Sequence, residues 1–310
     1  MATQLLPDVV PGDIPAWQHS VVAFLAEKER RSGSRRTVEG YARLLWPFLN
    51  QAGSPELVRP AHVLAWAYGK GPSGRDPQSA TVAARIACVS SYFRFLIRMG
   101  LATGNPCDAV ERPRSVSAPA RGLSADEVRR LLAILPDTVA GRRDRAIVLT
   151  LILTGRRRAE VIGLTAGDVM LEDDVPYYTY RGKGGKGGRR ELPGPAYTAM
   201  LATLADAKLV LTDMPPPASL WQAGARPIGV RSSTFYARFR RYLRLAGLPV
   251  SGIHILRHTA AKLRRDAGES IEAVSSFLDH SSLAVTTVYL RRLEGDSDAG
   301  WPDVAGAIGL

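Results

Sequence analysis

The sequence has few cysteines and comparatively few acidic residues, and both shortages limit what the protein can be. Its 310 residues include only Cys88 and Cys107, which provide neither a disulfide framework nor a metal-binding cysteine cluster. This cysteine usage fits a reducing cytosol. Acidic residues number 29 against 41 lysines and arginines, so the formal net charge is +12 and the pI is near 10.1. A protein this basic is expected to bind a polyanion, most commonly nucleic acid.

Long apolar segments are missing as well. No apolar run of membrane-spanning length and no basic amphipathic anchor stands out, so a membrane is the weaker alternative partner. The N-terminal segment, MATQLLPDVVPGDIP, has no basic region followed by an apolar core, and we do not expect it to be a secretory signal. Carboxylates and histidines do not cluster as metal ligands would. We therefore expect a cytoplasmic protein without a metal or another cofactor.

The first hundred or so residues are predicted to form a bundle of four amphipathic helices, because apolar residues recur there at helical spacing. Several arginines lie at and beyond the first turn between helices, where they form either a solvated face or contacts with phosphates. The predicted helices cover Ile14–Arg31, the segment between a capping Ser34 and Gly53, Ala61–Tyr68, and the segment from Ser79 to just before Gly100, and the arginines are Arg30, Arg31, Arg35, Arg36 and Arg43.

A stretch rich in proline, serine, alanine and arginine, roughly Asn105 to Gly122, has no periodicity and is predicted to be an extended linker. Ser124 and Glu127 then form a predicted capping box at the start of a second, larger domain. We place the first domain at residues 1–108, the linker at 109–122 and the second domain at 123–310. Such a protein could clamp around a duplex.

Three consecutive arginines, Arg156 to Arg158, follow the predicted core helix Asp144–Leu153. They could be a solvated basic patch. A helix that continues through Glu160, however, would place Arg157 on its apolar side. An arginine near a core needs an anionic partner, and Glu160 could orient it while a substrate phosphate accepts its other hydrogen bonds. This pattern favours a phosphate-binding arginine.

A β-hairpin is predicted next, because Val175–Arg181 is rich in aromatic and β-branched residues and GKGGKGG separates it from RRELP. The glycine-rich turn lacks the P-loop spacing. The acidic triplet at 172–174 is expected to be a solvated turn and not a metal site. Further helices are predicted at Pro193–Leu211 and Ser232–Ala246, and the second has a basic face that we expect against DNA, formed by Arg238, Arg241 and Arg244.

Four polar residues near the C-terminus suit phosphoryl chemistry: His254, Arg257, His280 and Tyr289. All four lie on segments predicted to be helical, and His254 and Arg257 are three apart, so they can face one target. Arginine binds phosphate, histidine moves protons, and a phenol oxygen can attack phosphorus. Taken singly, a histidine or tyrosine of this kind is more often a satisfied structural residue.

In combination, His-x-x-Arg-His, then Leu-Asp-His, then a tyrosine nine positions on resembles the C-terminal box of the tyrosine recombinase (phage integrase) family, including its Xer-like members. Upstream, Thr154-Gly-x-Arg-x-x-Glu followed by Leu164 and Asp168 also resembles the family pattern. The chain departs from it at Arg156 and Arg158, where the family usually has aliphatic residues. Register selects Arg157 over Arg156, and in the hairpin it selects Lys183, with Lys186 as the alternative. The implied catalytic residues are Arg157, Lys183, His254, Arg257, His280 and Tyr289.

The resemblance implies a mainly α fold with a small β-hairpin or sheet, in which an N-terminal helical core-binding bundle precedes an α+β catalytic domain with a tail from about residue 293. It implies a site-specific recombinase that cuts and rejoins double-stranded DNA through a 3′-phosphotyrosyl intermediate at Tyr289, without a metal or ATP. A type IB topoisomerase and a catalytically idle DNA-binding protein are the alternatives. Free protein is expected to be a monomer, and four copies to assemble on two DNA sites, associated with the nucleoid. The apolar segment Trp301–Leu310 can either fold back on its own chain or dock on a partner, and we expect it to dock on the neighbouring subunit.

Overall fold

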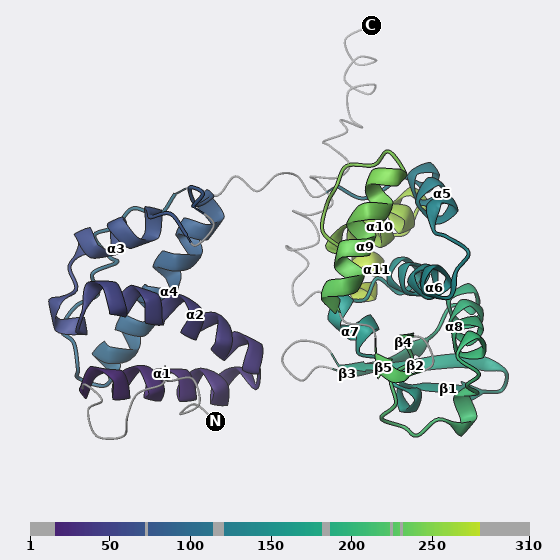
Figure 1. The fold of residues 1–310 in the computed structure, drawn as a ribbon, viewed down its shortest axis with the longest axis horizontal. Coiled ribbons are helices and arrows are strands. Elements are labelled where there is room, and N and C mark those ends of the chain that lie inside the picture. The colour runs from purple at the N-terminus through teal and green to yellow at the C-terminus, as the bar shows by residue number, and fades with distance from the viewer. Residues whose placement is uncertain are drawn as a thin grey trace, which may run out of the picture. The chain divides into compact units, whose positions relative to one another are not determined.

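The computed structural model divides the chain into two compact units, residues 1–117 and 118–310, and each is described by itself (Figure 1). The structure describes residues 16–71, 74–113, 121–181, 187–223, 226–229 and 232–279. Four of the residues singled out by the sequence, Lys183, Lys186, His280 and Tyr289, lie outside this described part, as does the tail from residue 293.

The first unit is a helical bundle, as predicted. Ser34 caps the second helix by accepting a hydrogen bond from the backbone N–H of Thr37 at 3.4 Å. Gly53, with φ of 83°, ends the same helix. The elements of the first unit are α1 (Ala16–Ser32), α2 (Arg35–Ala52), the short 3-10 helix η2 (Pro55–Leu57), α3 (Pro60–Tyr68) and α4 (Ser79–Arg98).

Helix α4 is the central helix of this bundle and packs against the other three. By length and composition alone it could cross a membrane, which the sequence analysis did not expect. Half of its most apolar stretch is buried in the unit, where Ile86, Val89 and Tyr92 have no exposed surface. The apolar composition of α4 therefore supplies the core of the bundle.

The chain leaves the first unit later than predicted. Cys107 and Val110 are buried in its core, and the Asn105 side-chain amide donates to Ser90 Oγ at 3.0 Å. The expected linker from Asn105 was therefore wrong over its first residues, because two apolar side chains hold them on the bundle. Burial also raises the pKa of the Cys88 and Cys107 thiols to about 12, so both are inert core residues at neutral pH.

The second unit is mainly helical with a small antiparallel sheet, and this fold class is the predicted one. Its helices are α5 (Ala125–Ile134), α6 (Val139–Thr154), α7 (Arg158–Ile162), α8 (Gly194–Asp206), α9 (Ser232–Leu245), α10 (His254–Asp266) and α11 (Ile271–Phe277), with 3-10 helices η3 (Ala166–Asp168) and η5 (Leu211–Asp213). Strands β1 (Val169–Glu172), β2 (Val175–Arg181) and β3 (Gly187–Glu191) form one sheet in that order, and β4 (Gln222–Ala223) pairs with β5 (Arg226–Gly229).

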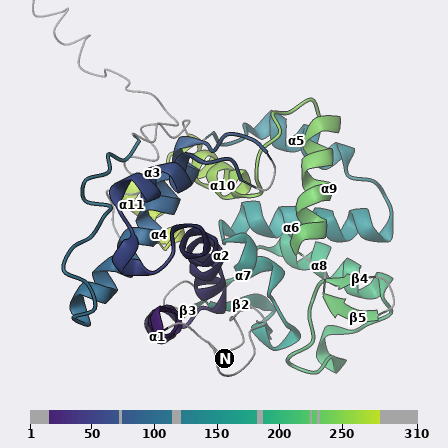
Figure 2. The same cartoon turned by 60° about the vertical axis from the view of Figure 1, so that its left-hand side comes forward.

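Helix α6 is the centre of the second unit. It packs against α8 on one side and α10 on another, and Figure 2 shows α9 crossing it. Ile147 and Leu151 of α6 are buried with Trp221, whose indole N–H donates to the Val161 carbonyl at 2.6 Å. The predicted capping box of Ser124 and Glu127 is present at the start of α5. The apolar face of α6 is thus part of the core of the unit, and the candidate site begins at the end of this helix.

Several element boundaries differ from prediction for local reasons. Strand β1 was not predicted, because the acidic triplet at its end is typical of a loop. Asp173 and Asp174 have φ of 46° and 64° and form the tight turn between β1 and β2. The β4–β5 pair was also missed. The helix expected over Pro193–Leu211 ends at Asp206. The predicted β2–β3 hairpin is confirmed.

Candidate active site

The core helix α6 does not continue through Glu160, as the sequence analysis expected, but ends at Thr154. Gly155 adopts φ of 62° and ψ of 11° and donates its backbone N–H to Leu151 O at 3.0 Å. A Cβ at this position would lie 2.5 Å from Phe277 Cε1, so only glycine fits both the conformation and the packing. The arginines that follow therefore leave the helix in a turn, and each takes its own direction.

Arg156, and not Arg157, is the arginine that enters the core. Its side chain is 1% exposed. The guanidinium hydrogen-bonds the Asp279 carboxylate and the Phe277 carbonyl, and its carbon lies 4.4 Å from the centre of the Tyr180 ring. The expectation that Arg157 lies on the apolar side was wrong, because the break at Gly155 changes the helical register on which it depended.

Arg157 is the N-cap of α7 and its side chain is 39% exposed. Glu160 holds it in place: one carboxylate oxygen accepts the Arg157 backbone N–H at 2.9 Å, and the other accepts Nη1 at 2.9 Å. Glu160 is itself 5% exposed, so its position is well defined. The expected orienting role of Glu160 is therefore present in the geometry, and Arg157 retains donors that face solvent.

Arg257 comes from α10 and is buried, with 4% of its surface exposed. Nη1 donates to the Gly155 carbonyl at 2.7 Å, and Nη2 donates to the Leu278 carbonyl at 2.5 Å. These bonds tie α10 to the break after α6 and to the chain that follows α11. His254 opens the same helix at the surface, with its ring packed edge-on against His258 at 4.8 Å between centroids.

The charges of these residues act on one another. Burial, and then the positive charges of Arg157 and Arg156, lower the pKa of Arg257 to about 10, while Glu160 and Asp279 oppose the shift. Partial removal of solvent, and then the charges of Arg257 and Arg157, lower the pKa of His254 below its ordinary value of 6.5. At neutral pH the site therefore combines charged arginines with a neutral imidazole, and an anion bound there would relieve the repulsion.

Three residues that the sequence analysis did not single out join this site. Asp279 accepts hydrogen bonds from Arg156, from the Tyr180 hydroxyl at 2.5 Å and from Arg190 Nη2 at 2.7 Å. Burial alone would raise the pKa of the Asp279 carboxyl, but these hydrogen bonds and the two arginine charges outweigh it and the pKa is lowered. These contacts join residues far apart in the chain, so the sequence has no local signal for them.

The predicted basic face of α9 is only partly available. Arg238 donates Nε and Nη2 to the fully buried Asp144 of α6 at 2.6 and 2.9 Å, and the Tyr242 hydroxyl donates to the same carboxylate at 2.9 Å. This ion pair engages the Arg238 guanidinium inside the unit, because the buried Asp144 needs a charged partner. The expected contact of Arg238 with DNA stays a prediction. Arg241 and Arg244 are exposed.

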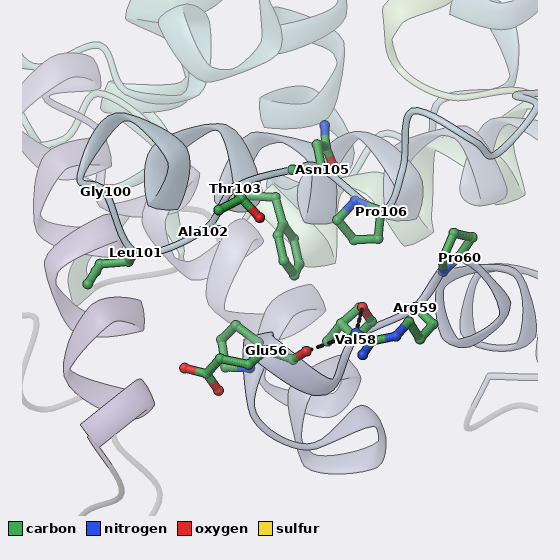
Figure 3. Close-up of a pocket in the computed structure, with 13 residues that line it drawn as sticks. Glu56, Val58, Arg59, Pro60, Gly100, Leu101, Ala102, Thr103, Asn105 and Pro106 are labelled. Carbon is green, nitrogen blue, oxygen red and sulfur yellow. Dashed lines mark hydrogen bonds between the residues drawn. The ribbon is translucent and has the colours of Figure 1, made fainter.

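Hollows elsewhere in the described residues do not gather catalytic groups. One of about 530 Å³ lies in the first unit between η2 and the loop after α4 (Figure 3), where Arg59 Nη1 is engaged by the Glu56 carbonyl at 2.8 Å. Another of about 370 Å³ lies beside α7 and is lined by Glu160, Asp168 and Tyr180. Within the described ranges, no group of three or more histidines, cysteines and carboxylates could hold a metal ion.

Comparison with known proteins shows which family and fold the chain resembles. Residues 121–295 match the model of the phage integrase family. Tyrosine recombinase XerC of Mycobacterium tuberculosis (strain ATCC 25177 / H37Ra) is 31% identical over 266 residues, which cover 83% of this chain and 87% of that protein. Tyrosine recombinase XerA of Pyrococcus furiosus is 28% identical over 269 residues, 86% of this chain and 87% of that protein.

Solved structures share the fold at lower identity. The lambda integrase(75-356) dimer bound to a COC′ core site superposes with a TM-score of 0.67 at 20% identity, covering 91% of this chain and 97% of that one. The XerH recombinase bound to palindromic difH substrate gives a TM-score of 0.66 at 16% identity, covering 100% of this chain and 92% of that one. The two-part helical fold with its small sheet is therefore a known one.

Proposed function

The chain belongs to the phage integrase family of tyrosine recombinases, and we propose that it exchanges DNA strands through a covalent link to Tyr289. Site-specific recombination, the activity predicted from the sequence, is confirmed at the level of the family. The finer assignment of residues to steps is our proposal. Experiments can distinguish this proposal from the two alternatives, a type IB topoisomerase and an idle DNA-binding protein.

The reaction is a pair of transesterifications. The Tyr289 oxygen bonds to phosphorus as the bond from phosphorus to the 5′ oxygen breaks, which leaves a 3′-phosphotyrosyl link and a 5′-hydroxyl. His254 accepts the tyrosine proton, and Lys183 donates a proton to the leaving 5′ oxygen. His280 hydrogen-bonds the phosphate. A 5′-hydroxyl from a second duplex then attacks the link, so the ester energy is retained and no ATP is consumed.

The single observation that carries this proposal is the concentration of cations at the break after α6. The positive charges of Arg156 and Arg157 both act on Arg257 there, and Glu160 and Asp279 are the carboxylates that oppose them. Arg156 is neutralised by Asp279, whereas Arg157 is partly exposed and can meet a phosphate. Fixed cations that face a developing negative charge stabilise a transition state strongly, because they need no reorganisation. The proposed charge stabilisers are therefore Arg157 and Arg257, without a metal.

Double-stranded DNA is the proposed partner, and the net charge of +12 supports it. Related solved structures are of recombinases on DNA, including a lambda integrase tetramer bound to a Holliday junction. We propose the same assembly here, four copies on two sites with monomers in free solution. In the first unit, Arg36 and Arg43 line one hollow of α2 and are the proposed phosphate contacts of the bundle. A cytoplasmic location, with the protein bound to the nucleoid, follows from this partner.

The decisive test uses a nicked suicide substrate, which traps the covalent protein–DNA adduct. Tyr289→Phe removes one oxygen, so it should abolish the adduct while DNA binding is retained. An adduct of undiminished yield in Tyr289→Phe would refute the assignment. Cleavage by the wild-type protein should persist in excess chelator; loss on chelation that magnesium restores would show that the arginines are not the main charge stabilisers. An idle protein would give no adduct in any variant.

A further inference from the structure

We propose that Asp279 is a positioning residue that holds the β2–β3 hairpin, and with it Lys183, against the arginine-bearing turn. The proposal rests on the function assigned above, because it concerns the same reaction. Asp279 is the residue directly before His280, and β2 ends at Arg181, two residues before Lys183. The Asp279 carboxylate contacts β2 and the residue before Arg157.

The first contact of Asp279 is with the turn after α6. Arg156 reaches it from the position next to Arg157, and the same guanidinium also hydrogen-bonds the Phe277 carbonyl. Arg156 is enclosed between aromatic rings, with its carbon 4.4 Å from the Tyr180 ring centre and 6.0 Å from that of Phe277. A buried ion pair with this many contacts has one geometry, because moving either partner leaves an uncompensated charge.

The second contact is with the hairpin, and both of its strands take part. From β2, the Tyr180 hydroxyl donates to Asp279 Oδ2 at 2.5 Å. From β3, Arg190 Nη2 donates to Asp279 Oδ1 at 2.7 Å and to the Ser276 carbonyl at 2.8 Å. Since both strands are hydrogen-bonded to the same carboxylate, the hairpin cannot tilt away from the turn without breaking charged hydrogen bonds.

The backbone conformation supports a fixed role for this residue. Asp279 has φ of 51°, in the left-handed region that non-glycine residues rarely adopt, although aspartate does so more often than most. Arg257 holds the carbonyl of the preceding Leu278, so the turn is clamped from the α10 side as well. A non-glycine residue keeps this backbone conformation where the surrounding contacts fix it. The hydrogen bonds of the Asp279 carboxylate are such contacts.

The test removes single hydrogen bonds from the hairpin and leaves the fold in place. Tyr180→Phe keeps the ring that packs on Arg156 but loses the donor to Asp279, and Arg190→Met loses the bond from β3. Matched controls lie on the other face of the same strands, where Arg189 pairs with Glu172 and its guanidinium carbon lies 4.2 Å from the centre of the Tyr177 ring. The controls are Tyr177→Phe and Arg189→Met. Single-turnover cleavage is measured on an ordinary substrate and on one with a 5′-bridging sulfur, whose leaving group needs no proton.

We expect Tyr180→Phe and Arg190→Met to slow cleavage of the ordinary substrate by about tenfold or more, as supporting hydrogen bonds of this kind do. On the sulfur substrate both should approach the wild-type rate, because a misplaced Lys183 no longer matters there. Both controls should match the wild type on both substrates. Asp279→Asn should show the larger defect, since it leaves Arg156 buried beside a neutral group.

Two results would overturn the proposal. One is unchanged cleavage of the ordinary substrate by both test variants. The other is equal slowing on the two substrates, which would mean that the hydrogen bonds maintain the fold and do not place the proton donor. The proposed function fails in a different experiment, if the wild-type protein forms no covalent adduct or if Tyr289→Phe is active. Failure of the Asp279 proposal can therefore be distinguished from failure of the proposed function.

Discussion

Arg156 and Arg157 are adjacent in the chain, but their side chains lie in opposite environments, 1% and 39% exposed respectively. The cause is Gly155, whose left-handed backbone ends α6 and turns the chain before the two arginines. Arg156 then pairs with Asp279 inside the unit, and Arg157 caps α7 and pairs with Glu160 at the surface. One arginine is therefore a structural cation, and the other is available to a bound anion.

Alanine substitutions should separate these two roles. Arg157→Ala should change the free energy of unfolding by about 1 kcal/mol or less, because the Arg157 side chain is partly exposed and its backbone N–H still binds Glu160, yet slow cleavage by about 100-fold. Arg156→Ala should destabilise the protein by about 3 kcal/mol, because it breaks a buried pair. Thermal unfolding and the rate of adduct formation measure the two effects. The reverse pattern would make Arg156 the phosphate-binding arginine and shift the family register by one residue.

The lowered pKa of His254 predicts a pH dependence. Since the folded-state pKa lies below 6.5, the imidazole is neutral at pH 7 and can accept the tyrosine proton. Below pH 6.5 the unfolded chain binds this proton before the folded one does, so the contribution to stability is present above 6.5 and lost as the pH falls through the folded pKa. Single-turnover cleavage should hold its rate down to pH 6.5 and decline below it.

His254→Gln provides the comparison for that profile, because the amide does not titrate. This variant should cleave more slowly than the wild type at pH 7, and its cleavage rate should lack the decline at acid pH that is due to His254. Its free energy of unfolding should fall less than that of the wild type between pH 6.5 and 5. A wild-type rate that already falls well above pH 6.5 would show that His254 is not the group that must be neutral.

The two lysines of the β2–β3 turn can be told apart by chemical rescue. Lys183→Ala should be slow on an ordinary substrate and recover on one with a 5′-bridging sulfur, because that leaving group needs no proton. Lys186→Ala should show little defect on either substrate. Single-turnover rates on both substrates give the answer, and the opposite pattern would move the role of proton donor three residues along the turn.

Helix α9 offers a matched pair for testing DNA contacts. Arg241 is exposed, so Arg241→Met should weaken DNA binding and reduce the slope of log affinity against log salt by about one. Arg238 is engaged with buried Asp144, so Arg238→Met should lower thermal stability instead. Affinity measured over a series of salt concentrations, together with unfolding midpoints, distinguishes the two. Loss of salt dependence in Arg238→Met at unchanged stability would support the predicted contact of Arg238 with DNA.

The C-terminal segment outside the described residues predicts assembly. Trp301–Leu310 is apolar and follows a polar spacer, so we expect it to bind a neighbouring subunit in a head-to-tail ring. Deleting residues 295–310 should spare binding to one half-site but impair synapsis of paired sites and recombination. Gel-shift and recombination assays measure these steps. Normal recombination by the truncated protein, or full relaxation of supercoils by intact monomers without strand exchange, would contradict this arrangement and favour a topoisomerase.

Much of this protein follows from its sequence because the signals are local. Helical spacing of apolar residues, the caps at Ser34 and Ser124, and the turn residues of the hairpin each depend on a few neighbouring positions. The spacing of His254 and Arg257 likewise places both on one helix. Chemistry carried by residue type and spacing, such as a phenol near arginines and histidines, also needs no tertiary structure to be recognised.

The tertiary structure alone decided which charges are buried and with whom they pair. Asp144 with Arg238 and Arg156 with Asp279 join residues 94 and 123 positions apart, and neither pairing has a local signal. The packing of Phe277 against Gly155, also distant in the chain, leaves no room for a Cβ at the break that precedes the two arginines. A charge is stable in a core only beside a compensating one, and that partner is supplied by folding and not by neighbours in the chain. Sequence thus determined the kind of chemistry, whereas folding decided which of two adjacent arginines is free to take part in it.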